Sequence, residues 1–300
     1  GLFLSLAAVL MIADLFISLW LSGLLRSNAL LIFLPFAAMM TSDAQAQSSQ
    51  PFEDMVRLTE EVVLAYVVTG DKEVDDISAA GLKGLANVLN QRTSVESVNT
   101  SGVDLEDSNL SFFSLLYWPI TKSQQIPSSS AYSSLNTYLG TGGVILFDTR
   151  NADILSLDDL TNNKMMQLTK PLDIPRLEPV PENHVLTRAF YLLENFPGRF
   201  NNGSLWVQTS NANVNDSGSE AFRFVNDGVT PVLIGSNDWS AAWAVDHSGR
   251  PKFAVGKGYA GERQREMALR FGVNLVMYVL TGNYKSDQVH VPAILERLGR

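Results

Sequence analysis

Cysteine is absent from the 300 residues. Its absence excludes disulfides, thiolate metal sites and thiol nucleophiles, and it says nothing about the redox state of the compartment. Histidine is rare: His184, His247 and His290 are the only ones, and none lies in a His-x-x-x-His or His-Glu-x-x-His pattern. We therefore expect no metal and no other cofactor.

Positive charge is also scarce, because 22 Lys and Arg residues face 31 Asp and Glu residues, for a net charge of −9. Binding to nucleic acid needs a cationic surface, so we expect no nucleic-acid partner. A Gly-x-Ser-x-Gly turn, which presents the nucleophile of α/β hydrolases, is missing as well. These absences argue against an enzyme without excluding one, and we assign no catalytic residue.

Long apolar runs are present only near the start of the chain. Residues 1–25 contain a single charge, Asp14, and at 1.5 Å per residue they are long enough to cross a bilayer. Arg26 and a second apolar run at 29–40 follow. The second run is either a short second membrane span or, together with Ala-Gln-Ala at 44–46, a segment that mimics a signal peptide and its cleavage site.

Both interpretations place the remaining chain in the periplasm, since the positive-inside rule puts Arg26 on the cytoplasmic side. We predict a transmembrane region of one or two helices at 1–41, a flexible polar linker at 42–60 and an α/β domain at 61–300. Because the chain begins at Gly1 inside an apolar run, we expect it to be the C-terminal part of a longer polypeptide.

Within the predicted domain, strands alternate with helices. A strand at 62–68 ends in Thr69-Gly70-Asp71, and Asp71 suits the N-cap of a helix whose apolar face is formed by Val74, Ile77, Gly81, Leu85 and Val88. Gly70 stands alone, without a glycine-rich fingerprint or a phosphate-binding Lys. We therefore interpret this segment as an ordinary strand-to-helix turn rather than a nucleotide site.

Further elements follow in the same alternation. We predict strands at 110–118, 144–147 and from 232, a helix after Pro127, an irregular excursion at 151–182, a helix from 184, a hairpin over 241–255 and a final helix at 261–281. The order predicts a mostly parallel sheet with helices on both faces.

Polar residues follow two of the predicted strands. Asp148, Thr149 and Arg150 end one strand, and Asn237, Asp238 and Trp239 end another. If the strands are neighbours, these residues meet at the carboxyl edge of the sheet, where ligands bind in open α/β folds. The candidate ligand-binding residues are Asp71, Asp148, Thr149, Arg150, His184, Asn237, Asp238 and Trp239.

Two interpretations of this set stay open. It is either a polar pocket with an aromatic wall, suited to a sugar, an amide or a peptide, or a structural cluster. In the structural alternative Arg150 pairs with Asp238, and Trp239 fills the edge of the core. His184, at the start of a predicted helix, suits a cap as well as a ligand.

Four motifs resemble a known family: His-Val-Leu-Thr-Arg-Ala-Phe-Tyr at 184–191, Gly-Ser-Asn-Asp-Trp-Ser-Ala-Ala-Trp-Ala at 235–244, Gly-Glu-Arg-Gln-Arg-Glu-Met-Ala at 261–268 and Asn-Leu-Val-Met-Tyr-Val-Leu-Thr-Gly-Asn-Tyr-Lys at 274–285. They are similar to the uncharacterised C-terminal domain of large bacterial inner-membrane proteins with a BatA-type aerotolerance N-terminal region. The resemblance implies a flavodoxin-like fold of the class I glutamine amidotransferase type and no known activity. Asp148-Thr149-Arg150 replace the Cys elbow of the amidotransferases, so no catalytic residue carries over.

From the residues and the resemblance together we expect a non-catalytic, membrane-anchored periplasmic domain of the bacterial inner membrane that serves envelope homeostasis. Its expected partners are inner-membrane proteins and a small polar or glycan ligand. One alternative is a hydrolase that acts through Asp148 or Asp238 with His184, which requires His184 within ~2.6–3.2 Å of a carboxylate. The other alternative is a purely structural scaffold in a membrane complex.

Overall fold

The computed structural model describes residues 62–95, 98–150, 160–209 and 229–298, with side chains up to residue 281. The predicted membrane region at 1–41 and the predicted linker at 42–60 lie outside these ranges. Among the described residues, no helix combines the length and the apolar character that a membrane span requires.

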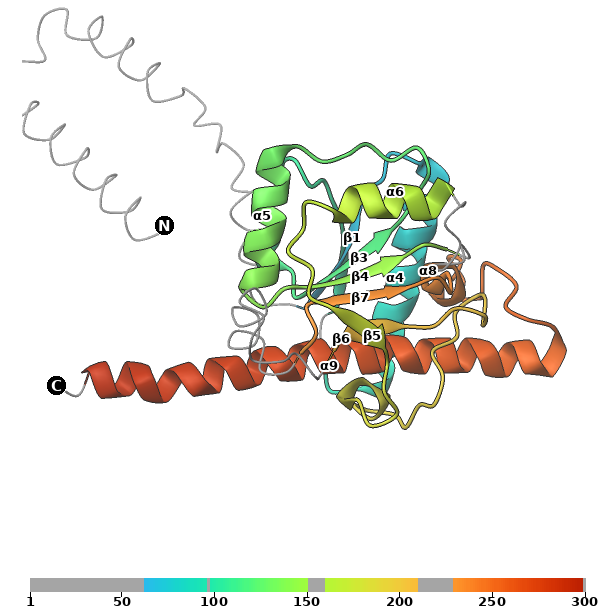
Figure 1. Cartoon of the computed structure of the whole chain (residues 1–300). Helices are drawn as coiled ribbons and strands as arrows, with labels where there is room; N and C mark the ends of the chain where they lie inside the picture. Colours follow the sequence, from blue (N-terminus) through green and yellow to red (C-terminus); the bar gives the residue numbers. More distant parts are fainter. Residues whose placement is uncertain (1–61, 96–97, 151–159, 210–228, 299–300) are drawn as a thin grey trace, which may run out of the picture. The chain divides into compact units, whose positions relative to one another are not determined.

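A seven-stranded sheet forms the centre of the domain, with the order β2-β1-β3-β4-β7-β6-β5 (Figure 1). Its strands are β1 (Val63–Val67), β2 (Asn99–Val103), β3 (Leu115–Pro119), β4 (Val144–Asp148), β5 (Leu177–Pro179), β6 (Trp206–Gln208) and β7 (Val232–Gly235). The first five strands in this order pair in parallel, whereas β6 and β5 are antiparallel to their neighbours. The predicted α/β fold with a mostly parallel sheet is confirmed.

Five α-helices lie in the described ranges: α4 (Lys72–Arg92), α5 (Ser129–Gly140), α6 (Leu160–Thr169), α8 (Trp239–Trp243) and α9 (Gly258–Leu298). One face of the sheet packs against α4, α8 and α9, and the other packs against α5 and α6 (Figure 1). Buried strand residues alternate between these two cores: Leu146 joins the first and Phe147 the second. Both faces are covered, as predicted from the apolar strands.

The start of α4 agrees with the sequence prediction. The Asp71 side chain accepts hydrogen bonds from the backbone N–H groups of Glu73 and Val74 and so caps the helix. The start of α5 also agrees with the sequence prediction. Ser128 caps this helix, and Leu135, Tyr138 and Leu139 are buried in the core.

Two predictions between residues 110 and 182 are wrong in part. The strand predicted from residue 110 begins only at Leu115, because the short 3₁₀ helix η2 (Leu110–Phe112) precedes it. The excursion predicted at 151–182 contains α6 and β5, while residues 151–159 lie outside the described ranges. The periodicity of α6 is hard to recognise because two of its four buried residues, Thr161 and Asn162, are polar.

The helix predicted from His184 is also wrong. Only the single 3₁₀ turn η3 (Val185–Thr187) forms there. The backbone beyond it is held by the buried Asn274 of α9, which accepts a hydrogen bond from the Tyr191 N–H at 2.7 Å and donates to the carbonyls of Leu186 and Tyr191 at 2.8 Å each. A tertiary contact thus replaces the helical hydrogen bonds.

At the C-terminal end, the predicted hairpin over 241–255 is reduced to one isolated bridge between Val245 and Pro251, because α8 occupies residues 239–243. The final helix, predicted at 261–281, is longer than expected and extends from Gly258 to Leu298.

Close packing of α4 on α8 yields a testable prediction. A Cβ atom on Gly81 would lie 2.3 Å from the carbonyl oxygen of Ser240, whereas a Cβ on Gly140, at the end of α5, meets nothing within 4 Å. Gly81→Ala should lower the free energy of unfolding by roughly 1–3 kcal/mol through overpacking. Gly140→Ala should be neutral or should raise it by up to ~1 kcal/mol, because Ala favours the helix.

Urea denaturation followed by tryptophan fluorescence measures both effects. Equal stability of the two variants would contradict the close packing of these helices.

Candidate functional site

Asp148 is the last residue of β4, and its carboxylate is completely buried. Oδ1 accepts hydrogen bonds from the backbone N–H groups of Arg150 at 2.9 Å and of Asp238 at 3.2 Å. Oδ2 accepts from the Trp239 N–H and from the Tyr117 hydroxyl, both at 2.9 Å. Four donors therefore surround this carboxylate, and they connect β3, β4 and the turn between β7 and α8.

The two turns that Asp148 connects have unusual backbone geometry. Arg150 has a φ of 55° and Asp238 a φ of 52°, and they are the only non-glycine residues with positive φ in the described part of the chain. This left-handed conformation costs an L-residue roughly 1–2 kcal/mol. The backbone N–H groups of both residues donate to the same oxygen of Asp148, so these hydrogen bonds help to hold both turns in place.

Tyr117 extends the network to α8. Its hydroxyl lies 2.9 Å from Asp148 Oδ2 and 3.0 Å from the Ser240 Oγ. The hydroxyl has one proton, so it donates a hydrogen bond to Asp148 when that group is ionised and accepts one from the Ser240 hydroxyl. The direction reverses when Asp148 is protonated. Both charge states of Asp148 are therefore compatible with a complete set of hydrogen bonds in this chain of three groups.

Burial determines the charge state of Asp148. Burial, together with the negative charge of Asp238, raises the pKa of Asp148 to about 6, against the lowering effect of the hydrogen bonds from Arg150, Trp239 and Tyr117. Burial, with Asp148 as the second cause, also raises the pKa of the Tyr117 hydroxyl well above its ordinary value.

Asp238 has a different environment, although it is also buried. Its Oδ1 lies 3.7 Å from Arg150 Nε and its Oδ2 lies 3.6 Å from an Nη of Arg199. Burial raises the pKa of Asp238, and the two arginines oppose that rise. Within the described ranges, Asp238 Oδ1 and Arg150 Nε have no hydrogen-bond partner. The ion pairs of Asp238 are thus longer than hydrogen bonds, whereas Asp148 is surrounded by donors.

The residues next to these two carboxylates form contacts that hold the fold together. Asn237 donates to the carbonyls of Phe196 and Gly203 and accepts from the Gly203 N–H, which attaches the segment 196–203 to the end of β7. Thr149 is buried, and its N–H donates to the carbonyl of Gly235. Trp239 is fully buried against Phe271 rather than lining a pocket, as the structural alternative anticipates.

Asp71 and His184 have other contacts. Asp71 caps α4, and the neighbouring Asp75 accepts hydrogen bonds from the N–H groups of Thr69 and Gly70. A carboxylate of the chain itself therefore occupies the donors that a phosphate would need, in agreement with an ordinary turn.

His184 caps η3 through its Nδ1 and packs against Tyr278, and burial lowers its pKa. In the described ranges, no hydrogen bond or ion pair joins His184 to Asp148 or Asp238. The pair that the hydrolase alternative requires is not formed in this structure.

Sequence reasoning missed three residues of the cluster: Tyr117, Ser240 and Arg199. Tyr117 belongs to the strand predicted at 110–118, and Ser240 belongs to the resemblance motif at 235–244. Neither residue lies in a sequence pattern that would mark it as part of a site. Arg199 follows the Pro-Gly pair at 197–198, and its guanidinium lies over the rings of Phe200 and Phe253 at 5.6 and 5.4 Å. No three His, Asp or Glu side chains gather to hold a metal in the portion that the structure describes.

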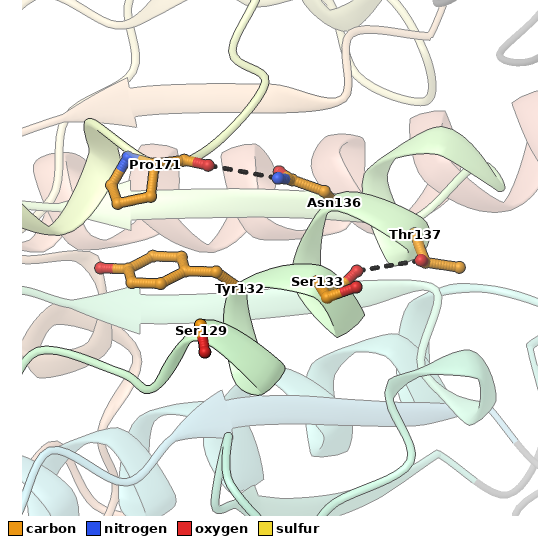
Figure 2. Close-up of a pocket in the computed structure, with 6 residues that line it drawn as sticks. All are labelled: Ser129, Tyr132, Ser133, Asn136, Thr137 and Pro171. Atoms are coloured by element: carbon orange, nitrogen blue, oxygen red, sulfur yellow. Dashed lines mark hydrogen bonds between the residues drawn. The ribbon is translucent and has the colours of Figure 1, made fainter.

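A separate hollow lies on α5 (Figure 2), lined by Ser129, Tyr132, Ser133, Asn136, Thr137 and Pro171. Several of its polar groups already have partners within the chain. Asn136 donates to the Pro171 carbonyl, and the Thr137 hydroxyl donates to the Ser133 carbonyl. No candidate residue from the sequence lines this hollow, and it has no charged side chain.

Comparison with known proteins identifies a family. The model of the family described as "Domain of unknown function (DUF4159)" matches residues 63–280. The chain belongs to this family. None of the curated proteins matches the chain significantly. The match bears out the predicted resemblance at the level of an uncharacterised domain, while the BatA-type N-terminal region stays a prediction. The whole strand-end cluster lies within the DUF4159 domain.

The hydrogen bonds of Asp148 predict a large effect of a small substitution. Asp148→Asn replaces one acceptor oxygen with an N–H₂ group that faces a donor. It should lower the free energy of unfolding by roughly 1–3 kcal/mol. Tyr117→Phe removes only one donor and should cost less. Urea denaturation of the DUF4159 domain in the full chain measures both. An Asn variant as stable as the wild type would contradict the role of the ionised carboxylate.

The raised pKa of Asp148 predicts that stability depends on pH. The folded chain keeps the Asp148 proton up to pH about 6, whereas the unfolded chain releases it near its ordinary pKa of 3.8. Folding therefore takes up a proton between these values, and the contribution of Asp148 to the free energy of unfolding should fall as pH rises through this window. The fall is on the order of 3 kcal/mol, from about two pH units at ~1.4 kcal/mol each.

Denaturation curves at pH 4, 5, 6 and 7.5 test this dependence. In Tyr117→Phe the carboxylate loses a donor, so the fall should extend to higher pH. The contribution of Asp148 is the difference between the wild type and Asp148→Asn at each pH. If this difference rises between pH 4 and 6, the hydrogen bonds outweigh burial.

Proposed function

We propose that the DUF4159 domain is a non-catalytic binding domain and that its ligand site is the Asp238 side of the strand-end cluster. The observation that carries this proposal is the contrast between the two carboxylates. Four hydrogen bonds surround Asp148. Asp238 instead has two long ion pairs to arginines that are 23% and 38% exposed, together with a backbone hydrogen bond from Ala241, and its Oδ1 has no hydrogen-bond partner in the described ranges. Asp148 supports the structure, and Asp238 with its arginines retains capacity for a polar ligand.

The strand order supports a more specific fold within this proposal. Among the parallel strands, the order β2-β1-β3-β4-β7 is that of flavodoxin-like sheets, in which ligands bind outside the carboxyl ends of the strands. Asp148 and Asp238 lie at or just beyond the carboxyl ends of β4 and β7. A relation to class I glutamine amidotransferases is part of the proposal, although the position of their nucleophile is filled by Asp148-Thr149-Arg150.

The cellular setting of the proposal rests on the sequence. The apolar residues 1–41 would anchor the chain in the bacterial inner membrane, with the DUF4159 domain in the periplasm and with inner-membrane proteins as partners. Envelope homeostasis is the process that this setting favours.

The scaffold alternative has one specific observation in its favour. Arg150 pairs with Asp238, as that alternative requires, and the pair lies at the edge of the core. The distance of 3.7 Å, however, is longer than a charge-assisted hydrogen bond of about 2.7–2.9 Å. A purely structural pair is expected to be closer.

A ligand screen separates these possibilities. The full chain, kept in detergent because of its apolar start, is melted by tryptophan fluorescence with sugars, amino acids, peptidoglycan fragments and divalent metals. A ligand at a hundred times its dissociation constant should add ~2.7 kcal/mol to the free energy of unfolding. The effect should disappear in Asp238→Ala.

Asp71→Ala is the matched control. It removes a helix cap, which costs ~1 kcal/mol, but it should keep the ligand effect. Stabilisation that persists in Asp238→Ala would place the site elsewhere, and the absence of any stabilising ligand would favour the scaffold.

A further inference from the structure

Positive charge gathers around Asp238 in a chain whose net charge is −9. Arg150 and Arg199 both approach the Asp238 carboxylate, at 3.7 and 3.6 Å. Arg199 also lies over the ring of Phe253, and Lys252 lies 5.9 Å from the centre of the same ring. These contacts form a continuous group from the end of β4 to the segment after α8, which we call the basic cluster: Arg150, Arg199, Lys252 and Arg265.

Arg265, on α9, adds a charge that no carboxylate offsets. Its guanidinium donates to the backbone carbonyls of Ala242 and Phe253, and no acidic partner is recorded for it in the described ranges. Burial lowers its pKa, as expected for a cation without a counter-ion. In the described ranges, Asp238 is the only acidic side chain that forms an ion pair with Arg150 or Arg199.

The arginines have unused donors. A guanidinium has five N–H donors in a planar fork that matches the oxygens of a carboxylate or a phosphate. Neither arginine forms the bidentate fork on Asp238: Arg150 lies 3.7 Å away, and Arg199 meets the carboxylate through a single long contact of 3.6 Å. The Arg150 Nε is buried and lacks an acceptor in the described part of the chain. A buried donor without an acceptor indicates a missing partner.

Arg199 is also held in position before any ligand arrives. The rings of Phe200 and Phe253 lie against its guanidinium, and Gln264 donates to the carbonyls of Gly198 and Arg199, which fixes the backbone of the segment. Such preorganisation reduces the entropy lost on binding.

We propose that the basic cluster binds an oxyanion, the carboxylate or phosphate group of a small ligand. Arg150 and Arg199 are the binding residues, Lys252 lies at the exposed rim, and Asp238 positions the two arginines. The inference rests on the proposed function, because it names the ligand class of the same site. It favours anions over neutral sugars, since two guanidinium groups contact the single Asp238 carboxylate.

The test uses the full chain in detergent and follows unfolding by tryptophan fluorescence. The probes are inorganic phosphate, succinate and glucose, with sodium chloride at matched ionic strength as the control. We expect a saturable rise of the midpoint temperature with phosphate or succinate beyond that with chloride. The anion that gives the rise identifies a phosphate or a carboxylate as the recognised group.

Variants then locate the site. Arg199→Gln and Arg150→Gln should each weaken binding at least tenfold, and Lys252→Gln, an exposed change that leaves the core intact, should weaken it several-fold. Arg263→Gln, on the exposed surface of α9, is the matched control and should bind like the wild type. Asp238→Asn should also weaken anion binding, because it removes the charge that positions the two arginines.

Four outcomes would overturn the inference. A midpoint shift with chloride as large as that with phosphate and succinate would show only the general effect of ionic screening, without a specific anion site. A shift with glucose that depends on Asp238, without an anion effect, would leave the proposed function standing and refute the oxyanion. No shift with any probe, and none in the wider ligand screen, would refute both. Should the arginine variants not fold, unchanged anion binding in Lys252→Gln and Asp238→Asn would refute the site.

Discussion

The candidate site depends on one buried carboxylate. Asp148 accepts hydrogen bonds from β3, from its own following turn and from the turn that begins α8. It thereby supports left-handed backbone at Arg150 and Asp238 and supplies an acceptor for the first N–H of α8. Without that acceptor, the donors would be buried and unpaired, which costs more than the hydrogen bonds contribute. The geometry of the strand ends follows from this single group.

The position of Asp148 among backbone donors explains why the two aspartates at the ends of neighbouring strands have different hydrogen-bond partners. Asp148 lies where backbone N–H groups converge, and its oxygens are fully used. Asp238 is displaced from β7 by Ser236 and Asn237, and two guanidinium groups and the Ala241 N–H reach its carboxylate. The same residue type thus holds the fold together in one place and orients two cations in the other. Membership of the DUF4159 family assigns neither role, so both follow from the contacts.

Local sequence signals predicted the elements that depend on local interactions. The apolar run of β4 and the Asp71 cap of α4 are confirmed, because burial and capping act within a few residues. The candidate site was predicted in part: parallel neighbours β4 and β7 bring Asp148 and Asp238 to one edge. The helix predicted from His184 failed because Asn274, far along the chain, takes the backbone hydrogen bonds of that segment. The spacing of apolar residues within 184–193 gives no indication of that contact.

The sequence by itself determined the α/β class, four of the five parallel strands and the sheet edge at which the candidate residues meet, because apolar runs and the polar residues after them are local features. The fifth parallel strand, β2, is mostly not buried and was not predicted. Only the tertiary structure decided which groups meet at that sheet edge. Arg199, Tyr117 and Ser240 join the cluster, whereas Asp71 and His184 contact their own helices and turns. The physical reason is that the charge state and the free hydrogen-bonding capacity of a side chain depend on burial and on distant donors. Those are fixed by packing rather than by neighbours in sequence.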